Sequence, residues 1–236
     1  MQHVSFQAVA PAPWSLHGDA FLLPIFKVSS MKQFDVNPLP DGKHWGLAGA
    51  MLLVRYHDTT VGPYSELIFT PGLYRLGTHI GFHISQIYVD SKKSLEGGRA
   101  NWAVPKKLAT FDWQNQDNQI LVTVSLPNAS QPFLTASFKQ SQRHIPASSV
   151  LVPPPLKTIL QACDPKLMQS DYLSTRLSAA GKLHLLSGTK VQSDGSEVPG
   201  DSNLGIWRTG ISLTDFQGTF AAPQALHTST GNHKTV

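Results

Sequence analysis

The chain has 236 residues, of which 41% are hydrophobic and 14% are charged, and its formal net charge is +4. This length suits one large domain with a substantial core, so we expect a single domain over residues 1–226 and a disordered tail over 227–236. No uninterrupted apolar run approaches the roughly 18 residues of a membrane span, and the first 26 residues lack the pattern of a secretory signal. The 19 basic residues are scattered, which argues against nucleic acid as a partner.

The only cysteine is Cys163, so no internal disulfide can form, and an inert thiol is the default expectation. A reducing, cytoplasmic location is the simplest interpretation. No group of cysteines and histidines has the spacing of a metal site, since His79 and His83 lie in an alternating segment that predicts a strand. The sequence therefore predicts neither a metal nor a cofactor.

Along the chain, 29–36 could form a short helix, and five runs of alternating or β-branched residues predict strands. These runs are 46–56, 64–72, 79–90, 119–126 and 133–140. Turn-forming residues at 115–119 and 126–132 predict hairpins between neighbouring runs, as in a meander.

The second half begins with a proline run, 153–155, that cannot continue a sheet. Residues 191–203 are polar and glycine-rich, which predicts a loop or hairpin tip, and 204–223 predict one or two final strands. Together these patterns predict an α+β domain, mainly antiparallel β, with a curved or closed sheet.

Two adjacent lysines, Lys106 and Lys107, follow Pro105 within an otherwise apolar stretch that includes Trp102 and Val104. A lysine amine is nucleophilic only when it is uncharged, and both burial and a neighbouring cation lower the lysine pKa. The stretch offers both effects, so Lys106 is a candidate nucleophile with Lys107 as its cationic neighbour. If Pro105 started a helical turn, the positive end of that turn would add to the effect. The alternative is an exposed Pro-Lys-Lys turn.

A second candidate is the lone carboxylate in the apolar run at 64–69. Strand alternation places Tyr64 and Glu66 on one face and Leu67 and Phe69 on the other. Glu66 is therefore either a buried functional carboxylate or a residue that points to solvent.

Three segments resemble the acetoacetate decarboxylase superfamily in order and spacing: "VGPYSE" at 61–66, "IYVDSKKSLEGGR" at 87–99 and "WAVPKKLATF" at 102–111. The resemblance implies a cone-shaped, largely antiparallel β-barrel with peripheral helices and an active site inside the barrel. It also implies that Lys106 forms a Schiff base, that Lys107 is its cationic neighbour and that Glu66 is the pocket glutamate. Members of the family tend to form symmetric oligomers, which leaves a homo-oligomer open here.

The chain also departs from the family pattern. Leu52 or Leu53 stands near the register of a second pocket glutamate, and Val104 stands where an aromatic residue often precedes Pro-Lys-Lys. No arginine occurs in 16–23, where the family has one, and Ala100 replaces the usual glutamate after Gly-Arg. A site with one carboxylate fewer and a more apolar lining would suit a larger and greasier substrate than acetoacetate.

Arg55 and Arg99 are candidates for the missing cation, although Arg99 could instead be structural. With Tyr64, Trp102 and Val104, these arginines are the expected substrate-binding residues.

The function implied is a lyase that acts on a β-keto acid or a polyketide-like carbonyl compound through a Schiff-base lysine. Decarboxylation is one reaction of this type, and an aldolase, dehydratase or cyclase would use the same iminium. Two alternatives stay open: a non-covalent cyclase or isomerase of an apolar intermediate, and a barrel that only binds a small ligand.

Overall fold

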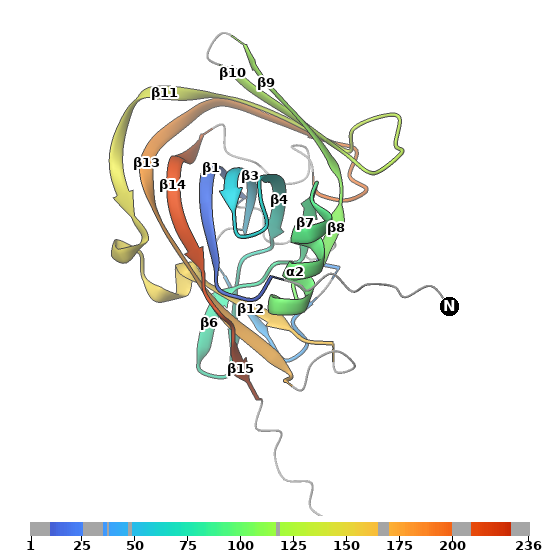
Figure 1. Ribbon diagram of the computed structural model, residues 1–236, viewed down its shortest axis with the longest axis vertical. Coiled ribbons are helices and arrows are strands. Elements are labelled where there is room, and N and C mark those ends of the chain that lie inside the picture. Colours follow the sequence, from blue (N-terminus) through green and yellow to red (C-terminus); the bar gives the residue numbers. More distant parts are fainter. Residues whose placement is uncertain are drawn as a thin grey trace, which may run out of the picture.

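The computed structural model describes residues 10–25, 35–36, 38–46, 49–116, 119–164, 170–199 and 209–227. Within these ranges the fold is dominated by one 15-stranded sheet, accompanied by the helix α2 (Lys92–Trp102) and two short 3₁₀ helices. The sheet curves strongly on itself, and α2 lies beside one of its ends (Figure 1).

The strands of the first half are β1 (Trp14–Ile25), β2 (Lys43–Gly46), β3 (Gly49–Thr59), β4 (Tyr64–Thr70), β5 (Leu73–Leu76), β6 (His79–Phe82), β7 (Gln86–Val89) and β8 (Lys106–Leu108). Those of the second half are β9 (Thr110–Gln116), β10 (Gln119–Ser125), β11 (Leu134–Ser148), β12 (Thr158–Ala162), β13 (Tyr172–Ser193), β14 (Gly210–Phe220) and β15 (Gln224–Leu226). The 3₁₀ helices η2 (Ser149–Leu151) and η3 (Pro154–Lys157) separate β11 from β12.

The sheet is built around the antiparallel series β13-β14-β1-β3-β4-β7, to which β8 adds in parallel beside β7. The 22-residue strand β13 pairs with β12 and β15 through its first part and with β11 through its later part. Strands β11, β10 and β9 then continue the sheet by antiparallel pairing. Only Ala109 separates β8 from β9, so the chain itself connects the two ends of this series. The predicted α+β, mainly antiparallel class is confirmed.

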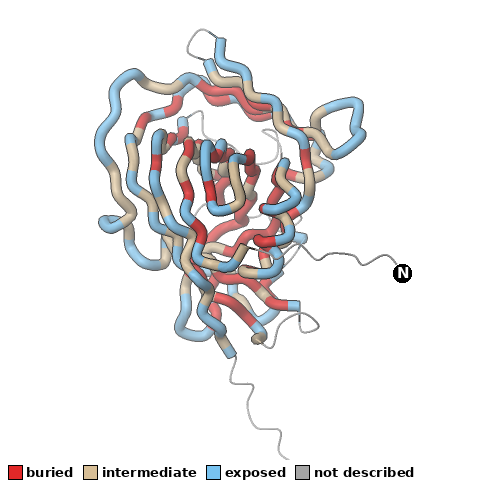
Figure 2. The backbone as a smooth tube through the Cα atoms, in the orientation of Figure 1, coloured by how far each residue is buried: buried red, intermediate tan, exposed pale blue. Residues whose placement is uncertain are grey.

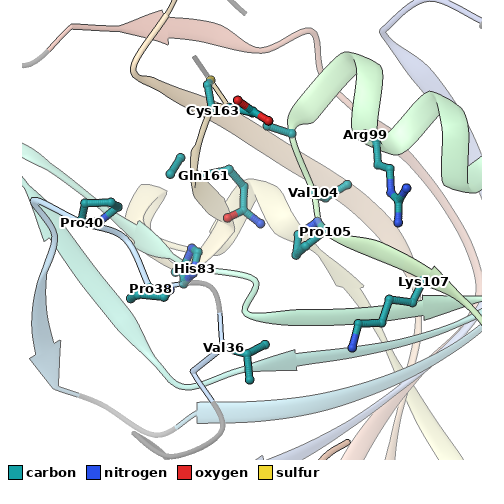
Figure 3. Close-up of a pocket in the computed structure, with 13 residues that line it drawn as sticks. Val36, Pro38, Pro40, His83, Arg99, Val104, Pro105, Lys107, Gln161 and Cys163 are labelled. Atoms are coloured by element: carbon teal, nitrogen blue, oxygen red, sulfur yellow. The ribbon is translucent and has the colours of Figure 1, made fainter. Parts of the chain in front are cut away.

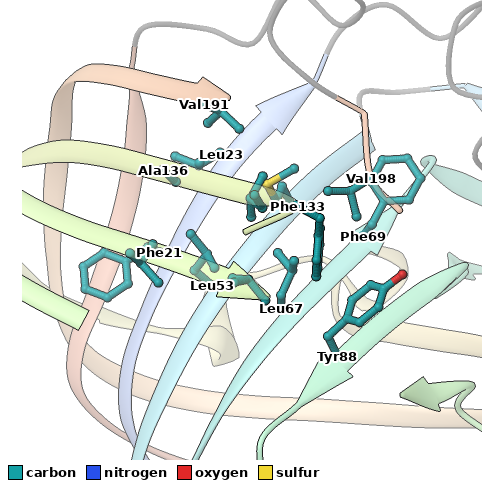
Figure 4. Packing of buried hydrophobic residues seen from close by; sticks show 14 of the residues in the cluster. Phe21, Leu23, Leu53, Leu67, Phe69, Tyr88, Phe133, Ala136, Val191 and Val198 are labelled. Carbon is teal, nitrogen blue, oxygen red and sulfur yellow. The ribbon is translucent and has the colours of Figure 1, made fainter. Parts of the chain in front are cut away.

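The described residues form three hydrophobic cores, and side-chain alternation places the two larger ones on opposite faces of the central strands. The first core includes Phe21, Leu53, Leu67 and Phe133, and Figure 4 shows how these side chains pack between facing strands. The second core lies on the other face, and its buried members are Trp14, Leu16, Val54, Tyr56, Tyr64, Ile84, Ile87, Val89, Trp102, Val104 and Phe216. The central strands carry buried residues along most of their length (Figure 2).

Most of the predicted strands are observed. The runs at 46–56, 64–72, 119–126 and 133–140 correspond to β3, β4, β10 and β11, and both predicted hairpins are antiparallel pairs. The run at 79–90 is two strands, β6 and β7, because the chain leaves one part of the sheet and joins another at 83–85. After the proline run, the chain forms η3 and then β12.

Other predictions fall partly or wholly outside the described residues. These include the short helix proposed for 29–36, of which only 35–36 are described, and the tail, of which only His227 is described. In the loop proposed for 191–203, β13 continues to Ser193 and a turn with Gly195 at φ +79° follows. Among the described helices, none is long and apolar enough to cross a membrane.

Candidate active site

Helix α2 directly precedes the strand that carries Lys106. Its N-cap residue, Ser91, accepts a hydrogen bond from the backbone N–H of Ser94, and its C-cap residue, Ala103, is left-handed with φ +54°. The chain reverses there and enters β8 at once, with Lys106 as the first residue of the strand. The predicted helical turn at Pro105 is therefore wrong, because β7 provides a hydrogen-bonding edge that draws residues 106–108 into the sheet.

Lys106 points into the second core and is only 5% exposed. Its Nζ donates hydrogen bonds to Oε2 of Glu66 at 2.7 Å and to Oγ of Ser94 at 2.9 Å. Glu66 lies two strands away on β4, on the same face as Tyr64, and is 4% exposed. The alternation predicted for β4 is confirmed, and the solvent-facing alternative for Glu66 is wrong. The Pro-Lys-Lys sequence is likewise not an exposed turn, since its first lysine is buried.

The hydroxyl groups of Tyr56, Tyr64 and Ser94 lie around this ion pair. Tyr56 donates a hydrogen bond to Oε1 of Glu66 at 3.2 Å, so the two carboxylate oxygens have different partners. The Tyr64 hydroxyl lies near those of Tyr56 and Ser94, which affect its pKa, and Ser94 accepts from Lys106. Lys106, Glu66, Tyr56 and Ser94 therefore each have a hydrogen-bond partner within the buried cluster, as burial away from water requires.

The two tyrosines stay uncharged over a wide pH range. Burial raises the pKa of Tyr56 well above its ordinary value, and the negative charge of Glu66 raises it further. The same two causes raise the pKa of Tyr64, against smaller opposing contributions from its hydrogen bonds with Ser94 and Tyr56. Both phenols are thus neutral hydrogen-bond donors next to the ion pair.

Aromatic and aliphatic side chains form the walls. The Nζ of Lys106 lies 5.2 Å from the ring centre of Tyr64 and 5.9 Å from that of Trp14, which favours a cation at this position. Trp102 packs edge-on against Trp14 with ring centres 4.9 Å apart. The cavity at Lys106, which we call the inner cavity, has a volume of about 60 Å³, and Trp102, Val104 and Tyr64 are among the residues that line it.

The missing Cβ of Gly98 makes room for the lysine. A Cβ built at Gly98 would lie 2.6 Å from both Cδ and Cε of Lys106 and 3.1 Å from a methyl group of Val104. Gly98 lies on the face of α2 that packs against β8, so the lysine side chain passes directly over the helix backbone.

Lys107 lies on the opposite face of β8 and is 49% exposed at its side chain. Its Nζ pairs with Oε2 of Glu197 at 3.0 Å and lies 5.6 Å from the ring centre of Tyr88, which belongs to the first core. Because adjacent strand residues alternate, the two ammonium groups point away from each other. The prediction that Lys107 acts as a cationic neighbour of Lys106 is therefore wrong. In a strand, adjacent side chains point to opposite faces, so the two ammonium groups are kept apart.

The two candidate arginines also lie elsewhere. Arg99 donates from Nε and Nη2 to the backbone carbonyl of Lys106, at 3.0 and 2.5 Å, and so holds β8 from the helix side. Arg55 is exposed on β3 and lines a different hollow, together with Asp19 and Trp113. Neither arginine lines the inner cavity, so the structural alternative for Arg99 describes its contacts better.

Sequence reasoning missed four residues of the site: Trp14, Tyr56, Ser94 and Gly98. Tyr56 could have been found, because it pairs with Tyr64 across the β3–β4 hairpin. Ser94 and Gly98 became visible only with α2, which the pair Gly97-Gly98 concealed, since glycine is a poor helix former.

The family model described as "Acetoacetate decarboxylase (ADC)" matches residues 47–159 of the chain. No curated protein matches the sequence. The fold matches solved structures along almost the whole chain. Acetoacetate decarboxylase from Legionella pneumophila subsp. pneumophila str. Philadelphia 1 is 16% identical with a TM-score of 0.69, over 96% of this chain and 92% of that one.

Two further solved structures have the same fold. The enduracididine biosynthesis enzyme MppR, complexed with pyruvate, is 11% identical with a TM-score of 0.69, over 94% of this chain and 93% of that one. An acetoacetate decarboxylase-like enzyme from Sphingomonas wittichii RW1 is 10% identical with a TM-score of 0.68, over 97% of each chain. Residues 47–159 are therefore similar to the acetoacetate decarboxylase family, and the fold predicted from the resemblance is confirmed along almost the whole chain.

The buried ion pair should be strongly coupled. Removing either partner, in Glu66→Gln or Lys106→Met, leaves the other charge buried without its counter-charge, and we expect a loss of about 3–5 kcal/mol in the free energy of unfolding. In urea denaturation, the free energy of unfolding of the double variant should fall by less than the sum of the losses in the two single variants. Lys107→Met is the matched control, with an expected loss below about 1 kcal/mol because that pair is half exposed. If the loss in the double variant equals the sum of the losses in the two single variants, the two groups do not interact.

All five tyrosines of the chain have a raised pKa, in each case mainly through burial: Tyr56, Tyr64, Tyr74, Tyr88 and Tyr172, the last to about 12. We therefore expect no tyrosinate absorbance from the folded protein near pH 10, where unfolded tyrosine ionises. Raised folded pKa values stabilise the fold below about pH 10, and this contribution is lost as the pH rises toward them.

Ultraviolet titration of the folded protein, compared with the protein in guanidinium chloride, measures this directly. A phenol that titrates near pH 10 while the fold is intact would contradict the assignment of all five rings to protected positions.

Proposed function

We propose that the protein is an enzyme, a lyase, that binds a small carbonyl compound as a Schiff base on Lys106. The observation that supports this most strongly is the position of the Lys106 amine in an apolar cavity, with its hydrogen bonds directed to one carboxylate and one hydroxyl. A lysine held away from water beside a group that can take its proton is the arrangement that amine nucleophiles need. The match of residues 47–159 to the acetoacetate decarboxylase family model, together with the shared fold, supports the same class of reaction.

In the proposed reaction, Glu66 accepts a proton from Lys106, and the neutral amine adds to the carbonyl carbon of the substrate. The carbinolamine loses its oxygen as water, with the proton returned by Glu66, and an iminium remains. The iminium is again a cation at the same place, so the carboxylate of Glu66 and the rings of Trp14 and Tyr64 stabilise it as they stabilise the ammonium.

For a β-keto acid, the bond between the α-carbon and the carboxylate then breaks, and its electron pair moves through the α-carbon to the iminium nitrogen. Carbon dioxide leaves, the carboxylate of Glu66 takes up one proton from solvent, and Glu66 donates this proton to the α-carbon of the resulting enamine. Water hydrolyses the new iminium and restores the Lys106 ammonium. Decarboxylation turns a charged group into a neutral gas, and an apolar lining favours that change.

The size of the inner cavity favours a small substrate. A volume of about 60 Å³ holds only a few non-hydrogen atoms, since one water needs roughly 10–15 Å³ by the same measure. The lining is as apolar as the sequence suggests, but a polyketide-like or polyene substrate is too large for it. A β-keto acid, or another short carbonyl compound with a leaving group at the β position, fits the cavity better.

Aldol cleavage or dehydration through the same iminium stays within this proposal, because each begins with the same covalent step. The non-covalent cyclase or isomerase and the simple binding barrel differ from it at that step. A cytoplasmic location and a homo-oligomer are further predictions, and neither enters the mechanism.

Covalent trapping tests the proposal. Sodium borohydride added in the presence of acetoacetate or pyruvate should reduce an iminium and leave a stable mass adduct, which peptide mapping should assign to Lys106. Lys106→Met should remove the adduct, and the matched variant Lys107→Met should retain it, because Lys107 faces the other core. Turnover without an adduct would favour the non-covalent alternative, and binding without turnover or adduct would favour the binding barrel.

Gly98→Ala tests the geometry of the nucleophile. The added methyl group would collide with Cδ and Cε of Lys106, so we expect trapping to slow by about tenfold or more, consistent with the sensitivity of reactions to displacements of about 1 Å. Alanine favours the helix by about 1 kcal/mol over glycine, so the fold should remain intact. Ala100→Ser, at an exposed position of the same helix, is the control. Unchanged trapping in Gly98→Ala would contradict the proposed path of the side chain.

A further inference from the structure

A second cavity of about 640 Å³ lies beside the inner cavity, and we call it the outer cavity (Figure 3). Its walls come from four separate parts of the chain: Val36 with Pro38 and Pro40, then His83, the segment at the end of α2, and the end of β12. Its volume falls within the range of about 300–1,000 Å³ that is typical of small-ligand sites. The proposed reaction at Lys106 makes no use of it.

The segment 103–107 separates the two cavities. Ala103, Pro105 and Lys107 line the outer cavity, Lys106 lines the inner cavity, and Val104 lines both. This wall is one continuous chain segment that turns at Ala103 and enters β8 at Lys106, so the two cavities share its backbone.

Arg99 is the charged group of the outer cavity that best fits an anionic ligand. Its Nε and Nη2 hold the carbonyl of Lys106, and no carboxylate among the described residues forms an ion pair with it. Arg99 is exposed and lines the cavity, and Figure 3 shows its side chain beside Val104. Lys107, the other cation of the lining, forms an ion pair with Glu197. The lining also contains one carboxylate, Asp164, which follows Cys163 after the end of β12. A guanidinium with free N–H groups is a preferred partner of carboxylates.

The remaining surface suits an apolar body. Val36, Pro38, Pro40 and Pro105 supply hydrocarbon walls, and the buried amide of Gln161, held by a hydrogen bond from its Nε2 to the carbonyl of Ile84, lies among them. A few polar groups that converge within a mostly apolar surface are typical of a site that orients a small molecule.

We propose that the outer cavity binds a small carboxylate with an apolar body, with the carboxylate on Arg99, and that its occupancy alters the reactivity of Lys106 through the 103–107 wall. The binding part is independent of the proposed function. The coupling part rests on it, because it concerns the Schiff-base lysine.

The chain contains a local reporter for the binding part. Cys163 lines the outer cavity, is 9% exposed and is the only cysteine, so every thiol modification reports on this place. Burial raises the pKa of its thiol, and the nearby Asp171 raises it further, so the reaction with iodoacetamide is best followed at mildly alkaline pH.

Benzoate at millimolar concentration should slow the alkylation of Cys163 several-fold, and benzamide, its uncharged counterpart, should not. Butyrate and butyramide provide a second pair with an aliphatic body. Equal effects of acid and amide would overturn the assignment of a carboxylate to Arg99, and no protection by either acid would overturn the site.

A pair of variants at an exposed position tests the charge requirement without disturbing the core. Val36 lies in the cavity wall and is 55% exposed, so Val36→Asn should keep the protection by benzoate, whereas Val36→Asp adds a like charge and should weaken it by about tenfold. Equal protection in the two variants would contradict the proposal. Calorimetric titration of the same variants with benzoate gives the affinities independently of the thiol.

The coupling is measured by borohydride trapping on Lys106 with and without benzoate, at a concentration that largely fills the site of the intact protein and leaves that of Val36→Asp mostly empty. A changed rate in the intact protein, and an unchanged rate in Val36→Asp, supports transmission through the wall. If benzoate binds and the trapping rate stays the same, the binding site stands and the coupling is wrong. If no adduct forms under any condition while Cys163 is still protected, the proposed function fails and the outer site survives.

Discussion

The whole site depends on one buried ion pair, Lys106 with Glu66, in the second hydrophobic core. The two charged groups are hydrogen-bonded to each other. Glu66 also accepts a hydrogen bond from the hydroxyl of Tyr56, and Lys106 donates one to the hydroxyl of Ser94. Burying such charges is costly unless they are paired and hydrogen-bonded, and well-packed apolar residues are often as stable. The stability of the fold therefore does not require such a pair, whereas the chemistry proposed for Lys106 does.

The curved sheet makes this arrangement possible because its two faces carry different cores. The same central strands contribute Leu53 and Leu67 to the first core, and Tyr56 and Glu66 to the second. Neighbouring lysines in β8 consequently enter different surroundings, with one buried beside a carboxylate and the other half exposed beside Tyr88. Strand periodicity, rather than repulsion between the two ammonium groups, distinguishes their roles.

Much of this could be predicted from the sequence. Alternation identified four strands and the face of Glu66, and three short motifs indicated the superfamily. Helix α2 was missed because two glycines weaken its pattern, and with it Ser94 and the space over Gly98. Arg55 and Arg99 were expected at the substrate because their charge was considered without their strand and helix positions. The residues around Lys106 come from β3 and β4, on the far side of β7, and from α2, which packs against β8. Their approach depends on contacts between segments that are distant in the sequence, and composition cannot reveal these contacts.

The central claim is that the Lys106 amine is enclosed while its neighbour is open to solvent. Competitive labelling of the folded protein with a bulky, charged amine reagent such as a sulfonated succinimidyl ester, followed by peptide mapping, measures both lysines in one experiment. The account predicts that Lys107 is labelled at the rate of an ordinary surface lysine and Lys106 at least tenfold more slowly, with equal rates once the protein is unfolded. Equal labelling of the two lysines in the folded protein would contradict it.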